Sequence, residues 1–349
     1  MTFLGMAKPT AGTARPAAPP PATPPVRRRT AVRAAVLPLA IGAVAVLGSC
    51  SAPAAAPPVP SGTASSAADG SRADGPAEDG PVVLTTFSVL ASLVEEIAGD
   101  RVEVLSLTKP GVEIHGYEPT PSDLVRLSEA SMVLDNGLGL ERWFEQFTET
   151  LDAERVVLSA GVEPIDIAQG EYSGRPNPHA WMAPSAAALY ADNAAAALSR
   201  LSPEDAGYFR ANAERLKEEL DALVDDAAAR LPDDAALVTC EGAFSYLARD
   251  LGLREHSLWP VNSDVEGTPR QIEAQIEFVR ANDVPAVFCE STVDDGAQRH
   301  VAEATGAELA GPLYVDSISP PDGPVPDFVS LLRHDLELIT DALGTEARP

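Results

Sequence analysis

One long amphipathic segment, residues 203–231, constrains the fold of this 349-residue chain more than any other feature. Its apolar residues recur at spacings of three and four until Pro232 ends the run: Phe209, Ala213, Leu216, Leu220, Leu223, Ala227 and Leu231. This is the period of one face of an α-helix, which at 1.5 Å per residue would be about 43 Å long. Such a helix is as long as a small domain, and strands alternate with helices on both sides of it. We therefore predict two lobes joined by one long helix.

The alternation itself indicates the fold class. The predicted strands are residues 82–86, 102–107, 132–134 and 155–158 before the long helix, and 236–239, 256–259, 286–289 and 313–315 after it. Helical patterns separate them, among them residues 122–129 and 141–150. Strands that alternate with helices are typical of parallel sheets. The predicted fold is α/β, with two lobes that each contain a parallel-type sheet flanked by helices and one long α-helix as the bridge.

Three helix starts share one local pattern. Thr120, Ser202 and Thr268 are each followed by proline and, at the third position, by an acid or an amide. The hydroxyl of such a residue accepts a hydrogen bond from an exposed amide of the first turn, and proline gives up an N–H that has no partner there. We expect three capping boxes, which are structural signals only.

The first 50 residues have the order of a bacterial export signal. Residues 1–33 contain several arginines and no acid, and an apolar run follows at 34–48. This run is shorter than the roughly 20 apolar residues that span a bilayer, so it fits the apolar core of a signal peptide. Its end, Leu47-Gly48-Ser49-Cys50, is similar to the box at which bacterial lipoproteins are cleaved and lipidated. We predict that Cys50 is lipidated; an ordinary signal peptide with an incidental cysteine is the alternative.

Composition divides the rest of the chain. Residues 51–80 are mainly Ala, Pro, Ser and Gly, and cannot bury enough apolar surface to fold. The predicted organisation is a signal peptide at 1–49, the lipidated cysteine and a disordered tether at 50–81, a first lobe at 82–202, the bridging helix at 203–231 and a second lobe at 232–349. Both export routes, the general one and the twin-arginine one, are compatible with the leader.

The charge excludes some classes of function. The chain has 52 acidic and 25 basic residues and a formal charge of −27. Nucleic-acid binding and electrostatic attachment to an anionic membrane both need a basic surface. Three cysteines are too few for a disulfide framework. The acidity itself is compatible with a solvated surface or with carboxylates that bind a cation.

Two of the five histidines lie in predicted loops. His115 follows the 102–107 strand, and His179 precedes an alanine-rich helix. In open α/β sheets the loops at the carboxyl ends of strands are where ligands bind. His256, His300 and His334 lie in highly charged helical or strand patterns, for which a solvated side chain is the default interpretation. Taken alone, His115 and His179 are weak candidates because a single histidine is more often structural than a ligand.

Six short motifs occur in a fixed order: HGYEPTPSD (115–123), NPHAW (177–181), TCEGAFSY (239–246), WPVN (259–262) with EGTP (266–269), ESTVDD (290–295) and YVDSI (314–318). Together they resemble the metal-binding lipoproteins of bacterial ABC importers for manganese, zinc and iron. The resemblance runs from about residue 82 to the C-terminus. It implies two α/β lobes bridged by a single long helix, with a metal ion bound between them.

By position, the resemblance assigns the metal ligands to His115 and His179 in the first lobe and to Glu241 and Asp316 in the second. Two neutral imidazoles and two carboxylates carry a charge of −2, which balances a divalent cation taken out of water. Both acids directly follow predicted strands. Either one alone would more simply be a helix N-cap or first-turn acid, but the four together predict a site for a first-row divalent metal.

The donor set favours Mn²⁺ as bound cargo, with Fe²⁺ next. Zinc-dedicated relatives generally have a third histidine where Glu241 stands, and oxygen ligands suit harder ions. The Irving–Williams order still allows this site to hold Zn²⁺ more tightly than Mn²⁺, so affinity alone does not identify the cargo.

Cys240 departs from the family pattern because relatives usually carry a small residue there. A thiolate beside Glu241 would favour zinc, whereas the alternation of a strand points the Cys240 side chain away from that of Glu241 and favours a buried core residue. Cys289 is predicted to be a core residue. A Cys240–Cys289 disulfide is compatible with an oxidising compartment, and the sequence does not decide it.

The resemblance implies an extracytoplasmic solute-binding lipoprotein, anchored to the cell membrane, that delivers its metal to an ABC permease and its ATPase subunits. We expect a monomer, no nucleic-acid partner and no enzymatic activity. The chain contains no P-loop, so we do not expect it to hydrolyse ATP itself. The alternatives are a zinc- or iron-dedicated protein of the same class, a surface adhesin or interaction protein with a structural metal, and a metal-dependent hydrolase. The last is disfavoured because all four ligand positions are filled and no HExxH motif is present.

Overall fold

The computed structural model describes residues 80–145, 147, 151–261 and 267–344. The predicted signal peptide, Cys50 and nearly all of the tether lie outside these residues. Backbone contacts divide the chain after Asp69, and every described residue belongs to the second unit. Within this described part of the chain, no helix is both long enough and apolar enough to cross a membrane.

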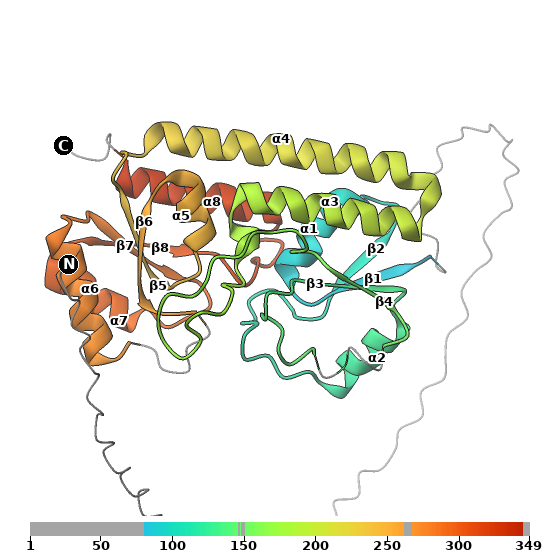
Figure 1. Cartoon of the computed structure of the whole chain (residues 1–349), viewed down its shortest axis with the longest axis horizontal. Helices are drawn as coiled ribbons and strands as arrows, with labels where there is room; N and C mark the ends of the chain where they lie inside the picture. Colours follow the sequence, from blue (N-terminus) through green and yellow to red (C-terminus); the bar gives the residue numbers. More distant parts are fainter. Residues whose placement is uncertain (1–79, 146, 148–150, 262–266, 345–349) are drawn as a thin grey trace, which may run out of the picture. The chain divides into compact units, whose positions relative to one another are not determined.

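The first lobe contains one four-stranded parallel sheet with the strand order β2-β1-β3-β4 (Figure 1). Its strands are β1 (Val82–Thr85), β2 (Glu103–Ser106), β3 (Met132–Asp135) and β4 (Glu154–Val157). Two helices follow its strands, α1 (Ser88–Ala98) and α2 (Pro121–Glu129). The central strand β3 is buried along its whole length, as expected for a parallel sheet covered on both faces.

The second lobe contains two parallel pairs of strands, β5–β6 and β7–β8. The strands are β5 (Ala236–Glu241), β6 (Arg254–Trp259), β7 (Ala286–Glu290) and β8 (Glu308–Leu313), and the helices between them are α5 (Ser245–Leu251), α6 (Pro269–Ala281) and α7 (Gly296–Thr305). A disulfide between Cys240 and Cys289 joins β5 to β7. The buried amide of Gln298 donates hydrogen bonds to the carbonyl oxygens of Val238 (3.2 Å) and Phe288 (2.9 Å), one on each of these strands.

The long helix α4 (Ala206–Arg230) runs along both lobes (Figure 1). It packs against α1 and α3 (Pro184–Leu201) of the first lobe and against α5 and α8 (Phe328–Leu343) of the second. Its buried residues follow the predicted period and include Phe209, Ala213, Leu216 and Leu220. They belong to one apolar core that contains residues of both lobes. The two lobes are therefore held together by a continuous core as well as by the helix.

Most sequence-based predictions of the fold are confirmed. The fold is α/β with parallel sheets, and the capping boxes at Thr120 and Thr268 are present. The third predicted box is wrong: Ser202 makes no side-chain cap, and a short 3₁₀ helix (Pro203–Asp205) precedes α4.

Two predicted elements differ from those in the structure: the helix at 141–150 and the strand at 313–315. The described residues of 141–150 form turns rather than a helix, because the Glu141 carboxylate turns inward and accepts hydrogen bonds from the backbone N–H groups of Asn136 and Gly137. The last strand is β8, Glu308–Leu313, so it ends where the predicted strand 313–315 begins.

Candidate metal centre

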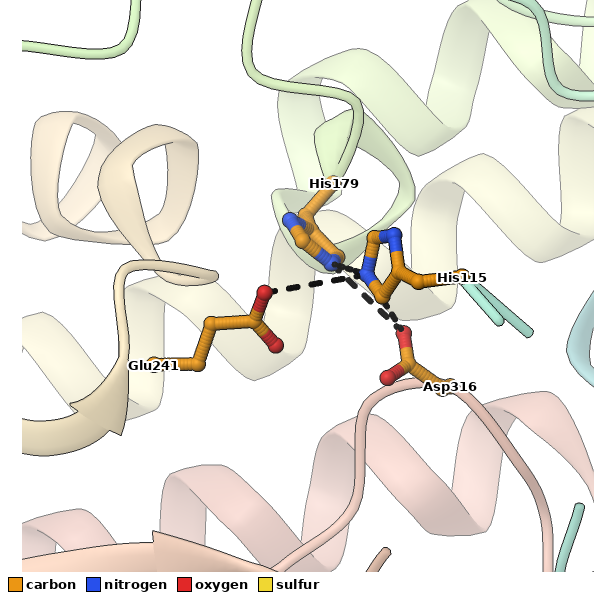
Figure 2. Close-up of side chains that lie close together, drawn as sticks. All are labelled: His115, His179, Glu241 and Asp316. Carbon is orange, nitrogen blue, oxygen red and sulfur yellow. Dashed lines mark hydrogen bonds and ion pairs between the residues drawn. The ribbon is translucent and has the colours of Figure 1, made fainter. Parts of the chain in front are cut away.

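Four side chains from four separate segments meet where the two lobes face each other (Figure 2). His115 lies in the loop after β2, and His179 immediately precedes the short 3₁₀ helix Ala180–Met182 that leads into α3. Glu241 is the last residue of β5, and Asp316 lies in the segment after β8. One ligand atom from each residue lies within 4.8 Å of those of the other three.

The distances among the four groups are short. The Nε2 atoms of His115 and His179 are 3.1 Å apart. His179 Nε2 lies 3.5 Å from Oδ1 of Asp316, and His115 Nε2 lies 3.7 Å from Oε1 of Glu241 and 3.9 Å from Oδ1 of Asp316. The His179, Glu241 and Asp316 side chains are at most 6% exposed, and His115 is 13% exposed. The cluster is thus almost sealed from solvent, with its small exposed area at His115.

A tight turn positions His115. The carboxylate of Glu113 accepts hydrogen bonds from the backbone N–H groups of His115 and, at 2.9 Å, Gly116. Ile114, between them in the chain, is fully buried in the core that both lobes share. The turn and its apolar anchor together point the imidazole toward the other three residues (Figure 2).

Asn177 positions His179. The Asn177 Oδ1 atom accepts hydrogen bonds from the backbone N–H of His179 at 3.1 Å and from its Nδ1 at 2.9 Å. A proton on Nδ1 leaves the lone pair of the neutral ring on Nε2, the atom that faces the cluster. The sequence places Asn177 in a motif, but nothing in its spacing shows that this amide sets the histidine tautomer.

The second lobe brings a third carboxyl group close to the cluster. Glu290, at the end of β7, is buried, and its two oxygen atoms each lie 3.3 Å from the backbone nitrogen of Glu241, which donates to them. Burial, the neighbouring charge of Glu241 and, less strongly, that of Asp316 raise the pKa of Glu290 well above its usual value. Three acids thus converge here, and a bound cation would offset their mutual repulsion.

Asp316 is buried beside both histidines. Burial raises the pKa of its carboxyl, but a hydrogen bond from His179 and the charges of His115 and His179 outweigh burial and lower it whenever these imidazoles are protonated; a bound cation would take the place of those protons. Trp181 Nε1 donates to the carbonyl of Val315 at 3.1 Å, which fixes the backbone next to Asp316. The carboxylate is therefore held in its ionised form, ready to bind a cation.

The arrangement offers two neutral nitrogen donors and two carboxylates to a single point. Their combined charge of −2 compensates a divalent ion in a buried setting, and either carboxylate can coordinate through one or both oxygens. The residues therefore fit a first-row divalent metal. All four predicted ligand positions come together. Residues 262 and 266, at the end of one predicted motif and the start of the next, lie outside the described residues.

The structure decides between the alternatives for Cys240 and corrects the interpretation of one histidine. Cys240 is disulfide-bonded to Cys289, so it offers no thiolate to the metal centre. Its side chain does point into the core, as the strand alternation predicts. His256 is half-buried rather than solvated, because its Nδ1 is hydrogen-bonded to Gln275 and its ring stacks on Phe278 at a centroid distance of 4.2 Å.

The fold and the position of this cluster define a class of protein, the two-lobed periplasmic metal-binding proteins. A Mn-bound mutant of a periplasmic metal-binding protein from Candidatus Liberibacter asiaticus superposes with a TM-score of 0.70 at 35% identity, covering 75% of this chain and 99% of the other. The periplasmic zinc-binding protein TroA from Treponema pallidum gives 0.69 at 25% identity, covering 76% and 99%.

The sequence places the chain in a family within this class. Residues 83–342 match the family model described as zinc-uptake complex component A, periplasmic, and the chain belongs to this family. It is 44% identical over 267 residues to the iron-binding protein YfeA of Yersinia pestis, covering 75% of this chain and 86% of YfeA. It is 31% identical over 274 residues to the manganese ABC transporter substrate-binding lipoprotein PsaA of Streptococcus pneumoniae, covering 75% of this chain and 89% of PsaA. The family is one of transport proteins rather than enzymes.

Proposed function

We propose that this protein is the extracytoplasmic solute-binding component of an ABC importer, which captures a divalent metal ion through His115, His179, Glu241 and Asp316 and delivers it to a membrane permease and its ATPase subunits. The observation that carries the proposal is the convergence of these four donors from both lobes on one buried point. Relatives that are substrate-binding components of metal ABC transporters support the transport role.

Mn²⁺ is the proposed cargo. Two carboxylates among four ligands favour a harder ion than zinc. The 31% identical relatives PsaA of Streptococcus pneumoniae and MntA of Halalkalibacterium halodurans are named for manganese. Fe²⁺ is the second candidate, because the 44% identical relative is an iron-binding protein and the same donors suit both ions.

The test is the metal content of the exported protein from cells that receive Mn, Fe and Zn together. We expect Mn in the wild type and a shift toward Zn in Glu241→His, which adds a softer nitrogen ligand. Glu163→His, at an exposed position, is the matched control and should keep the wild-type metal. A wild type that carries only Zn in manganese-replete cells would show that the cargo assignment is wrong.

Delivery to a permease is tested in cells. We expect deletion of the gene to lower Mn accumulation and excess Mn²⁺ to restore growth, and the Asp316→Ala variant to fail to complement. A surface adhesin with a structural metal would instead leave Mn accumulation unchanged in the deletion strain.

Attachment of the chain to the membrane through a lipid on Cys50 is part of the proposal. It is supported by the leader and the residues before Cys50, and by relatives that are lipoproteins. Acyl chains contribute about 0.8 kcal/mol per buried CH₂, so a multiply acylated cysteine would anchor the protein stably. Wild-type protein should incorporate labelled palmitate and sediment with membranes, and Cys50→Ser should do neither. Equal sedimentation of the two proteins would contradict the anchor.

A further inference from the structure

The amide of Asn177 connects a ligand of the first lobe to the second lobe. Its Oδ1 accepts from His179, and its Nδ2 donates to the carbonyl of Gly242 at 2.7 Å, in the residue that follows the ligand Glu241. The buried carboxamide of Asn177 is therefore hydrogen-bonded both to His179 and to the residue that follows Glu241.

The partners of this amide permit only one orientation. The Gly242 carbonyl can only accept a hydrogen bond, so the NH₂ group of Asn177 must face it. The backbone N–H of His179 can only donate, so the oxygen of Asn177 must face that group. Because the same oxygen also faces Nδ1 of His179, that ring nitrogen must carry the proton.

The chain of hydrogen bonds continues beyond Asn177 into the second lobe. Asn177 Nδ2 also donates to Ser245 Oγ at 3.2 Å, and the Ser245 hydroxyl donates to Oε2 of Glu255 at 2.5 Å. Glu255 is held in turn by the backbone N–H of Phe244, which donates to its Oε1 at 3.2 Å. The hydroxyl of the buried Tyr246 donates to the Asn177 carbonyl at 2.8 Å and fixes the asparagine backbone.

We propose that Ser245 and Glu255 of the second lobe are positioning residues for the ligand His179 of the first lobe, and that they act through Asn177. The proposal rests on the proposed function, since it assumes that His179 binds the metal. Glu255 orients the Ser245 hydroxyl so that its lone pair faces Asn177. Ser245 and Gly242 then hold the NH₂ group, and the asparagine oxygen keeps the proton on Nδ1 and the lone pair on Nε2.

This series of hydrogen bonds couples the contact between the two lobes to the affinity for the metal. Groups that orient a metal-bound histidine typically change metal affinity by about 10- to 100-fold when they are removed. Here two of those groups lie in the opposite lobe from the histidine. Any movement that separates Ser245 from Asn177 therefore weakens the hold on His179 without displacing a ligand directly.

The first test is a double-mutant cycle, with MnCl₂ as the only probe and calorimetry of the metal-free chain as the measurement. We expect Asn177→Ala to weaken Mn²⁺ binding by about 10- to 100-fold and Ser245→Ala by about tenfold. The double variant should bind no more weakly than Asn177→Ala alone, because Ser245 acts only through the asparagine. Losses that multiply in the double variant, or a Ser245→Ala variant with wild-type affinity, would overturn the proposal.

Two controls separate positioning from general stability. Ser199→Ala removes another half-buried hydroxyl, one that donates only to the Ala195 carbonyl within α3, and should leave Mn²⁺ affinity unchanged. Ser245→Thr keeps the hydroxyl beside a cavity of about 400 Å³ and should restore binding. The proposal would be contradicted if Ser199→Ala lowered Mn²⁺ affinity as much as Ser245→Ala does. It would also be contradicted if Ser245→Thr bound Mn²⁺ as weakly as Ser245→Ala.

The second test needs no metal. Nitrogen-15 spectra of the imidazoles in the metal-free chain should show His179 with its proton on Nδ1 in the wild type and a mixture of tautomers in Asn177→Ala. An unchanged tautomer in Asn177→Ala refutes the positioning role. A wild type that binds no Mn²⁺ would instead refute the proposed function, so the two failures are distinguishable.

Discussion

The two lobes supply different kinds of ligand from differently built sheets. The first lobe offers two imidazoles from loops next to one continuous four-stranded sheet. The second lobe offers two carboxylates, at the end of β5 and after β8, which belong to two separate strand pairs. The two neutral imidazoles thus come from the lobe with the continuous sheet, and the two charged carboxylates come from the lobe whose strands form two separate pairs.

Side chains close the gap between the two strand pairs of the second lobe. The Cys240–Cys289 disulfide and the Gln298 amide connect β5 to β7, and Gln275 Nε2 donates to the carbonyl of Thr239 on β5 at 2.9 Å. These contacts lie within a few residues of the ligand Glu241. Side-chain and covalent links therefore hold the strand that carries Glu241, whereas a continuous backbone ladder joins the strands of the first lobe.

The largest effect should follow from neutralising a charge of the second lobe. Asp316→Asn removes one of the two charges that compensate the cation, and loss of one partner of a buried charge pair costs about 3–5 kcal/mol. This corresponds to Mn²⁺ binding weaker by about 10²- to 4 × 10³-fold. Titration calorimetry on the metal-free protein measures it.

Asp335→Asn provides the matched control. Asp335 is a buried acid of the same lobe that lies outside the donor cluster and accepts from the backbone N–H of Tyr314 at 2.9 Å. We expect this variant to bind Mn²⁺ as the wild type does. If both variants lost affinity equally, general disturbance of the second lobe would explain the result better than lost ligation.

Removal of the disulfide should have the next largest effect, on stability. Cys240 and Cys289 are separated by 49 residues, and a cross-link that closes a loop of this size typically stabilises a protein by about 2–4 kcal/mol. We expect Cys240→Ala/Cys289→Ala to lower the free energy of unfolding in urea by this amount. Reduction of the wild type should have the same effect, whereas Cys50→Ser should have none. A double variant as stable as the wild type would show that the link between β5 and β7 is dispensable.

Gln298→Ala tests the hydrogen bonds between the same two strands. It leaves the buried carbonyls of Val238 and Phe288 without this donor, and a buried polar group that loses its partner costs about 1–3 kcal/mol. We expect a loss of free energy of unfolding in this range, measured in urea. Gln169→Ala changes an exposed glutamine and should be neutral. Equal stability of the two variants would mean that the Gln298 amide contributes nothing to the contact between β5 and β7.

The sequence predicted features that depend on local patterns. The period of residues 203–231 led to α4, and proline after a hydroxyl residue led to the caps at Thr120 and Thr268. The meeting of His115, His179, Glu241 and Asp316 was predicted from six motifs in order, because the four positions are too far apart in the chain for spacing to join them.

Features that depend on three-dimensional contacts are missed by the sequence or, as for the disulfide, left undecided. The 141–150 pattern has helical spacing, yet hydrogen bonds from Asn136 and Gly137 to Glu141 hold the segment in turns. The roles of Asn177 and Glu290 depend on which atoms face them across the lobes or between strands. The disulfide depends on β5 lying next to β7, which no local pattern reveals.

The last prediction concerns buried acids of the first lobe that lie outside the donor cluster. Burial and the neighbouring charge of Asp135 raise the pKa of Glu141 to about 7 from its usual 4.5. Burial raises the pKa of Asp135 to about 6, against the opposing effect of Arg155. Between about pH 4.5 and 7 the folded chain therefore holds protons that the unfolded chain has lost. The free energy of unfolding should fall as the pH rises through this range.

Glu141→Gln keeps this position neutral at every pH, so it should remove about 3 kcal/mol of that fall. Urea unfolding of the metal-free chain at a series of pH values measures the effect, and Glu163→Gln, at an exposed acid, should leave the slope unchanged. Because Glu141 lies outside the donor cluster, Mn²⁺ affinity at neutral pH should stay at the wild-type value. A Glu141→Gln variant with altered Mn²⁺ affinity, but with an unchanged dependence of its free energy of unfolding on pH, would contradict this contrast between the two lobes. It would mean that a buried acid of the first lobe acts on the metal, as the acids of the second lobe are expected to do, rather than on stability.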